Sequence, residues 1–187
     1  MKEFLLSILS FLFGIGGKPV EVIDPAIELE EVKVVEMMID TRDNKDINAF
    51  LYAIGQRESG GDYSVVNSYG YMGKYQFGRR TLNKLGYRHI SNKEFLSSPE
   101  IQEQVMIRLL EHNKYVLRRH MHNVGKRAYG IEITESGMLA AAHLLGPGKV
   151  RRFLRNGKIY RDGYGTPITE YLERFGGYDT SKIISRR

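Results

Sequence analysis

Hydrophobic residues recur at helical spacing in the stretch that precedes two adjacent glycines near residue 60. The stripe consists of Ile47, Phe50, Leu51 and Ile54. Glu58 occupies the next position on this stripe, and Gly60–Gly61 then favour a left-handed helix end. The pattern predicts a helix over residues 46–59, with Asn44 or Asp46 as its N-cap and with Glu58 facing inward at its end.

Hydrophobic periodicity elsewhere predicts a mainly α-helical body. Further helices are expected over residues 79–85, 99–119, 138–145, 149–154 and 167–175. Ser98–Pro99 marks the start of the longest one, and Thr134 or Ser136 caps the one that follows it. The glycines and aromatic residues of 70–77 predict a compact turn or short β-hairpin beside the first helix, and residues 125–130 are expected to form a loop.

The position of Glu58 suits a general acid. A carboxylate on the apolar face of a helix is poorly hydrated, and desolvation favours its protonated form. A general acid that works near neutral pH needs this form. The alternative is a helix-terminal acid that reaches solvent or pairs with Arg57, since charged residues are mostly exposed. Asp62 is either a second catalytic carboxylate or a turn residue that bonds its own backbone.

Three motifs in this order resemble those of one enzyme family. They are Glu58–Ser59 followed by Gly-x-x-Gly-x-x-Gln at 70–76, the alanine-rich segment 141–150, and the Pro-x-x-Thr-like segment 166–171 that closes with a tyrosine. Together they resemble the soluble lytic transglycosylases and the goose-type lysozymes, over roughly residues 47–178. The resemblance implies a mainly α, lysozyme-like α+β fold, with one small β-hairpin beside the catalytic helix.

The resemblance also implies a reaction and the residues that carry it. Lytic transglycosylases cleave the β-1,4 bond between N-acetylmuramic acid and N-acetylglucosamine in peptidoglycan with one catalytic Glu, and they form 1,6-anhydro ends without a cofactor or metal. Glu58 matches that residue, and Ser59 would bind a sugar or its peptide substituent. Gln76 and the backbone around Tyr75 would bond the N-acetyl groups, and Tyr171 would orient the catalytic Glu.

Aromatic and histidine side chains complete the expected cleft. Tyr71 and Tyr75 are predicted to form its walls, because aromatic faces suit sugar rings. The chain departs from the family pattern at His143–Leu144, where relatives have Tyr-Asn. We expect His143 to line the cleft, and the alternative is a buried core histidine.

Two other functions fit the same motifs. A hydrolytic muramidase of the same fold would use water in place of the sugar's 6-hydroxyl. A non-catalytic wall-binding or virion structural protein would retain the fold without the reaction. The reaction products distinguish the muramidase from a lytic transglycosylase. The effect of replacing Glu58 on activity distinguishes the non-catalytic protein from both enzymes.

The N-terminal quarter of the chain differs in composition from the rest. Residues 4–17 carry no charge, which predicts that segment 1–17 is a signal peptide or a retained membrane anchor. Residues 18–45 are expected to form an acidic linker, and residues 46–187 the catalytic domain. The protein is therefore expected to be exported to the periplasm or cell envelope, or anchored in the membrane, or carried in a virion if it comes from a phage.

Charge is distributed unevenly along the chain. Residues 21–46 carry nine acidic and three basic side chains, whereas residues 47–187 carry 23 Lys and Arg against 12 Asp and Glu. The basic body favours a polyanionic partner such as wall carboxylates, anionic lipid or nucleic acid. Nucleic acid is the least favoured, because no recognition motif is visible. His112, His120 and His122 lack a metal-binding motif and the chain lacks cysteine, so no metal site is predicted.

Overall fold

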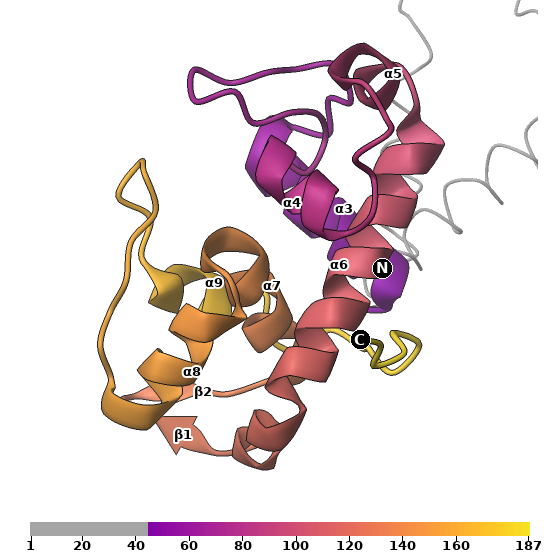
Figure 1. Cartoon of the computed structure of the whole chain (residues 1–187). Coiled ribbons are helices and arrows are strands. Elements are labelled where there is room, and N and C mark those ends of the chain that lie inside the picture. Colours follow the sequence, from indigo (N-terminus) through magenta and orange to yellow (C-terminus); the bar gives the residue numbers. More distant parts are fainter. Residues whose placement is uncertain (1–44) are drawn as a thin grey trace, which may run out of the picture. The chain divides into compact units, whose positions relative to one another are not determined.

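α-Helices form about half of the chain between residues 45 and 187, which are the residues that the structure, a computed structural model, describes. A two-stranded antiparallel sheet and several loops connect them (Figure 1). The mainly α-helical prediction is therefore confirmed for this part of the chain. None of its helices has the length and apolar character needed to cross a bilayer. The predicted segment 1–17 and nearly all of the predicted linker 18–45 lie outside the described residues.

Helix α3 (Ile47–Ser59) begins and ends where the sequence predicts. The side chain of Asp46 accepts a hydrogen bond from the Ala49 N–H at 2.9 Å, which makes Asp46 the N-cap. Gly60 ends the helix in the left-handed conformation with a φ of 68°. Phe50 and Ile54 of the apolar stripe are buried in the core, and Ile47 and Leu51 are partly buried against it, so that this face of α3 points inward.

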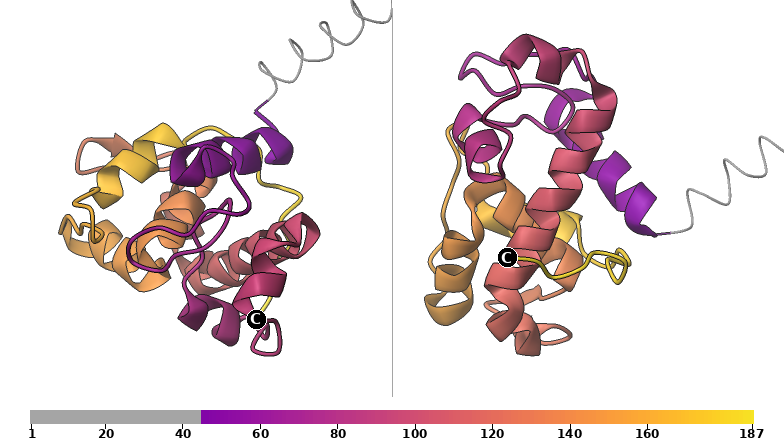
Figure 2. Two further views of the ribbon diagram at one scale, coloured as in Figure 1. Left: turned by 90° about the horizontal axis from the view of Figure 1, so that it is seen from above. Right: turned by 45° about the vertical axis from the view of Figure 1, so that its right-hand side comes forward.

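Helix α6 (Pro99–Leu117) is the scaffold on which the other described elements pack. It runs the length of the body in Figure 1 and in the right-hand view of Figure 2. Its buried side chains include Val105, Met106 and Leu110, each of them 0% exposed. The last turn of the predicted helix continues as the 3-10 helix η1 (Arg118–Asn123).

The elements on the two sides of α6 form two groups. Helices α3, α4 (Arg79–Lys84) and α5 (Asn92–Leu96) gather at one end of the body, together with the loop that follows α3 (Figure 1). Helix α5 was not predicted, although Ser91 caps it by accepting a hydrogen bond from the Glu94 N–H at 3.1 Å. Its five residues are too few to show helical periodicity in the sequence.

The second group consists of α7 (Glu135–Leu145), α8 (Pro147–Asn156) and α9 (Ile168–Arg174). Helix α7 packs against α6, α8 and α9, and α8 also packs against α6. The hydroxyl of Thr134 caps α7 by accepting the Gly137 N–H at 3.0 Å. At the other end of α7, Gly146 alone separates it from α8, so that one helix follows the other directly. Both helices border the space between the two groups.

The sheet lies away from its predicted position. Strands β1 (Arg127–Ala128) and β2 (Ile131–Glu132) pair antiparallel within the stretch that was predicted to be a loop. Tyr129 and Gly130 connect them with φ values of 52° and 85°, as a two-residue turn of type I′ requires. The dipeptide Tyr-Gly lacks the asparagine or aspartate that usually signals this turn, so the turn could not be predicted from these residues.

The segment 70–77 folds into a compact turn, which is one of its two predicted forms, and its strand pairing is confined to isolated bridges. Met72 and Phe77 exchange two backbone hydrogen bonds of 3.0 and 2.8 Å, and Met72 also forms an antiparallel bridge with Val66. The small hairpin predicted beside the catalytic helix therefore does not extend into regular strands. Gly73 has a φ of 69°, and a Cβ at this position would overlap with the side-chain amide of Gln102. The turn therefore requires glycine at this position.

Candidate active site

Glu58 lies in the last turn of α3 and points into the body rather than into solvent. Its side chain is 14% exposed. The hydroxyl of Tyr171 donates a hydrogen bond of 2.6 Å to Glu58 Oε1, and His143 Nε2 lies 3.6 Å from the same oxygen. The structure thus brings together three predicted site residues, which come from α3, α7 and α9.

Tyr171 is held as a hydrogen-bond donor. Its side chain is 2% exposed, and its ring lies against that of Phe175 with a centroid distance of 5.0 Å. Burial raises the pKa of Tyr171, and the neighbouring carboxylate of Glu58 raises it further, because both oppose a second negative charge. The hydroxyl therefore keeps its proton and holds the carboxyl group of Glu58 in place.

His143 lies at the wall of the same site as a neutral imidazole. Its side chain is 6% exposed, and its ring packs edge-on against Phe77 with a centroid distance of 5.8 Å. Burial lowers the pKa of His143, and the nearby Glu58 opposes this shift only in part. The separation of 3.6 Å from Glu58 Oε1 exceeds a normal hydrogen bond, so that Tyr171 and not His143 orients the carboxyl group.

A cleft of about 740 Å³ opens beside Glu58 between the two groups of helices. One side is lined by residues 67–85 in the loop and α4, and the other by residues 142–147 and 162–164. Several lining side chains can contact a sugar through an aromatic face or a polar group, and they are Asn67, Tyr69, Tyr71, Gln76, His143 and Tyr164. Three of the predicted binding residues, Tyr71, Gln76 and His143, are therefore at the cleft.

Tyr71 and Gln76 reach the cleft because the turn 70–77 presents them there. The Tyr71 ring is 45% exposed and lies over Gly78, where an added Cβ would come within 2.9 Å of it. Gln76 has a φ of 51°, and its side-chain amide donates a hydrogen bond of 3.0 Å to the carbonyl oxygen of Gly73. This bond fixes the amide on the cleft wall.

Ser59 and Tyr75 do not line the cleft. The Ser59 hydroxyl donates a hydrogen bond of 2.9 Å to the carbonyl oxygen of Lys74, so it ties the turn to α3. Tyr75 is 0% exposed, and its hydroxyl donates to Glu103 Oε2 at 2.6 Å. The prediction that the Tyr75 side chain forms a cleft wall is wrong, because this ring packs inward when its neighbour Gln76 faces the cleft.

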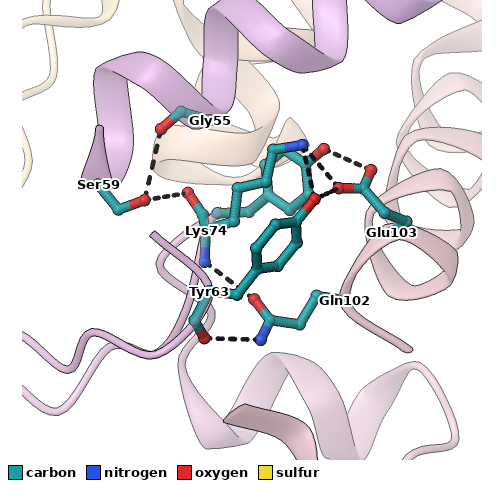
Figure 3. Close-up of polar contacts among 7 residues, drawn as sticks. Gly55, Ser59, Tyr63, Lys74, Gln102 and Glu103 are labelled. Carbon is teal, nitrogen blue, oxygen red and sulfur yellow. Dashed lines mark hydrogen bonds and ion pairs between the residues drawn. The ribbon is translucent and has the colours of Figure 1, made fainter. Parts of the chain in front are cut away.

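A buried polar network supports the turn from beneath (Figure 3). The Lys74 ammonium group donates to Glu103 Oε1 at 2.7 Å and to the Tyr63 hydroxyl at 3.1 Å. Burial opposes ionisation of Glu103, but hydrogen bonds from Lys74, Tyr75 and Tyr63 outweigh it and lower the pKa of Glu103. The network therefore contains a true ion pair that joins the turn to α6.

Gln102 completes this support, and the sequence did not reveal it. Its side-chain oxygen accepts the Lys74 backbone N–H at 2.9 Å, and its amide group donates to the carbonyl oxygens of Tyr63 and Phe95 at 2.8 and 2.9 Å. The side chain is 0% exposed, so all three bonds are shielded from water. The amide thereby fixes the 70–77 turn, the loop that follows α3 and helix α5 to one position on α6.

Asp62 is a turn residue, as one of its two interpretations predicts. Its Oδ1 accepts hydrogen bonds from the backbone N–H and hydroxyl of Ser64 at 2.7 and 2.8 Å, and these bonds lower the pKa of Asp62. The second carboxylate that lines the cleft is Asp162, which the sequence analysis did not single out. Its Oδ1 accepts the backbone N–H groups of Tyr164 and Thr166 at 3.0 and 2.7 Å and so shapes the 162–166 loop.

The histidines that were considered as metal ligands do not converge. His112 lines the cleft, whereas His120 and His122 belong to η1. Within residues 45–187, no three His, Asp or Glu side chains are arranged to hold a common ion.

The chain matches no protein-family model, no curated protein and no solved structure. The chemistry of the site must therefore be inferred from its own geometry.

Proposed function

We propose that this protein is a peptidoglycan lytic transglycosylase of lysozyme-like fold. The observation that carries the proposal is Glu58, a poorly exposed carboxyl group that borders a cleft and is oriented by Tyr171 at 2.6 Å. Its substrate would be the glycan strand of the bacterial wall, and its place of action the cell envelope. Aromatic and amide groups on the cleft wall suit N-acetylated sugars.

One carboxyl group suffices for the reaction. Glu58 first donates its proton to the bridging oxygen, and the C1–O bond breaks with its electron pair passing to the leaving sugar. The Glu58 carboxylate then removes the proton of the 6-hydroxyl on the same muramic acid residue. The 6-oxygen bonds to C1, which gives a 1,6-anhydro end and returns Glu58 to its protonated form without consuming water.

Two observations favour Glu58 over Asp162 as the acid and base. Asp162 Oδ1 is already occupied by two backbone N–H groups, which leaves this carboxylate a structural function in its loop. Glu58 accepts one side-chain hydrogen bond from Tyr171 and lies where water is scarce.

The products that the protein releases from purified wall peptidoglycan test the proposal. Mass spectrometry should find muropeptides that end in 1,6-anhydro-muramic acid, and Glu58→Gln should abolish them because the amide cannot donate and accept the proton in turn. Glu173→Gln, on the exposed surface of α9, is the matched control and should retain activity. An active Glu58→Gln variant would exclude Glu58 from the mechanism, and a folded but inactive wild-type protein that binds peptidoglycan would indicate the non-catalytic alternative.

A hydrolytic muramidase is the second candidate, and Asp162 is the observation that favours it. A second carboxylate in the cleft could stabilise the sugar cation or direct a water molecule. Reducing ends in place of anhydro ends would identify this reaction. Asp162→Asn keeps an oxygen that can accept both backbone bonds and removes the charge, so a hydrolase that uses Asp162 should lose activity, while a transglycosylase should keep most of it.

A further inference from the structure

A second concave site lies between η1 and α8, with a volume of about 630 Å³. Its lining side chains are rich in positive charge and amide groups, and they are His120, His122, Asn123, Arg151, Arg152 and Arg155. Among residues 45–187, no Asp or Glu lines this basic pocket, and none of its three arginines forms an ion pair. The described residues thus concentrate positive charge here without supplying a counter-charge.

The arrangement of these groups indicates an anionic ligand. Arg151 and Arg155 are four residues apart on α8, so their like charges share one face and repel each other. Burial lowers the pKa of His120, and the charges of Arg151 and His122 lower it further. An anion in the pocket would relieve both repulsions.

The number of donors suits a phosphate group. Guanidinium groups bind oxyanions through paired N–H groups, and three of them with an amide offer more donors than the two oxygens of a carboxylate can accept. Gly148, in the first turn of α8, also lines the pocket, and nothing would lie within 4 Å of a Cβ there. The helix N-terminus adds its positive partial charge on this open side.

The surroundings of the pocket favour a lipid over a soluble polyanion. Residues 118–128 and 147–158 carry nine Lys and Arg side chains and no Asp or Glu. Both segments lie at the end of the body that carries α8 and the sheet (Figure 1). Large apolar side chains are exposed in the same region, with Val124 42%, Tyr129 57% and Ile159 54% exposed. A soluble polyanion needs charge alone, whereas exposed apolar groups among basic ones suit a bilayer interface.

We infer that the basic pocket binds the phosphate of an anionic phospholipid headgroup and docks this end of the body on a membrane surface. The inference does not depend on the proposed cleavage reaction, because no residue of the Glu58 site contributes to the pocket.

Sedimentation of the full-length chain with lipid vesicles tests the inference. The quantity to compare is a ratio of two affinities, that for mixed vesicles of phosphatidylglycerol and phosphatidylcholine over that for vesicles of phosphatidylcholine alone. Apolar segments bind both kinds of vesicle, so their contribution cancels in this ratio. Each basic side chain near an anionic surface strengthens binding by about fivefold, so Arg151→Gln/Arg155→Gln should lower this ratio by about 25-fold. Arg80→Gln/Arg88→Gln removes the same charge from exposed positions outside the pocket and should lower it by less than about twofold.

A second pair of variants separates a lipid surface from a soluble polyanion. Val124→Ser/Ile159→Ser should weaken vesicle binding several-fold and leave binding to inorganic polyphosphate unchanged, because both side chains are exposed and uncharged. Equal losses for the two arginine pairs would overturn the pocket as the binding site. Full vesicle binding by the Val124→Ser/Ile159→Ser variant would overturn the lipid surface as the partner. If the double arginine variant does not fold, the single variants should each lower the ratio about fivefold.

Discussion

Replacing Tyr171 with phenylalanine isolates the hydrogen bond on which the proposed site depends. The substitution removes the hydroxyl that donates to Glu58 Oε1 at 2.6 Å. The ring itself is buried against Phe175, and phenylalanine can occupy the same space. Any loss of activity can therefore be assigned to the missing donor rather than to a cavity.

The expected loss follows from the strength of a hydrogen bond to a charged group. Such a bond contributes about 1.5–3 kcal/mol. If Glu58 holds its reactive orientation through this bond, the barrier rises by a similar amount and the rate falls about 10- to 150-fold. The folded state also loses the bond, so the free energy of unfolding should fall by about 1–3 kcal/mol.

The initial rate of muropeptide release from purified peptidoglycan measures this effect, and thermal unfolding followed by circular dichroism checks that the variant is folded. Tyr52→Phe is the matched control, since it also removes a hydroxyl, from an α3 side chain that is 63% exposed. It should keep full activity. A folded Tyr171→Phe variant whose rate stays within twofold of wild type would refute the orienting function of Tyr171.

Three further predictions concern stability. Because burial lowers the pKa of His143, the unfolded chain binds a proton at this residue more readily than the folded chain does. The free energy of unfolding should therefore fall as the pH drops below the ordinary histidine pKa of 6.5. His143→Asn should reduce this fall in urea titrations between pH 5 and 7.5. Glu103→Gln leaves the ammonium group of Lys74 without its ion-pair partner and should lower the free energy of unfolding by about 1–3 kcal/mol in chemical denaturation. An unchanged free energy of unfolding would mean that the pair is fully solvated. Gly73→Ala should cost about 2–4 kcal/mol, whereas Gly70→Ala, with a φ of 77° but open space around the Cβ, should cost about 1 kcal/mol; similar losses would argue against steric overlap at residue 73.

Local signals account for the elements that the sequence predicted well. Asp46 and Gly60 delimit α3 because capping depends on a few neighbouring residues, and Pro99 starts α6 for the same reason. The inward position of Glu58 followed from four apolar residues at helical spacing, so that a catalytic candidate could be named before its neighbours in space were known.

The support of the cleft could not be predicted, because its contacts span distant parts of the chain. Lys74 and Glu103 lie 29 residues apart, and neither has a neighbour in sequence that indicates the other. Loops also lack a repeating period, so the composition of 70–77 did not reveal which aromatic ring faces the cleft. Tyr71 and Tyr75 belong to the same motif, yet the first is 45% exposed and the second 0%.

Glu58 must both give and take a proton in the proposed reaction, so its neighbours must serve the acid and the carboxylate alike. The hydroxyl of Tyr171 donates to Glu58 Oε1, and a carboxyl group retains an oxygen that can accept this bond in either form. His143, neutral because burial lowers its pKa, adds no positive charge that would fix Glu58 as a carboxylate. A positive charge at residue 143 should therefore slow the first step, and His143→Lys should lose activity even where it folds.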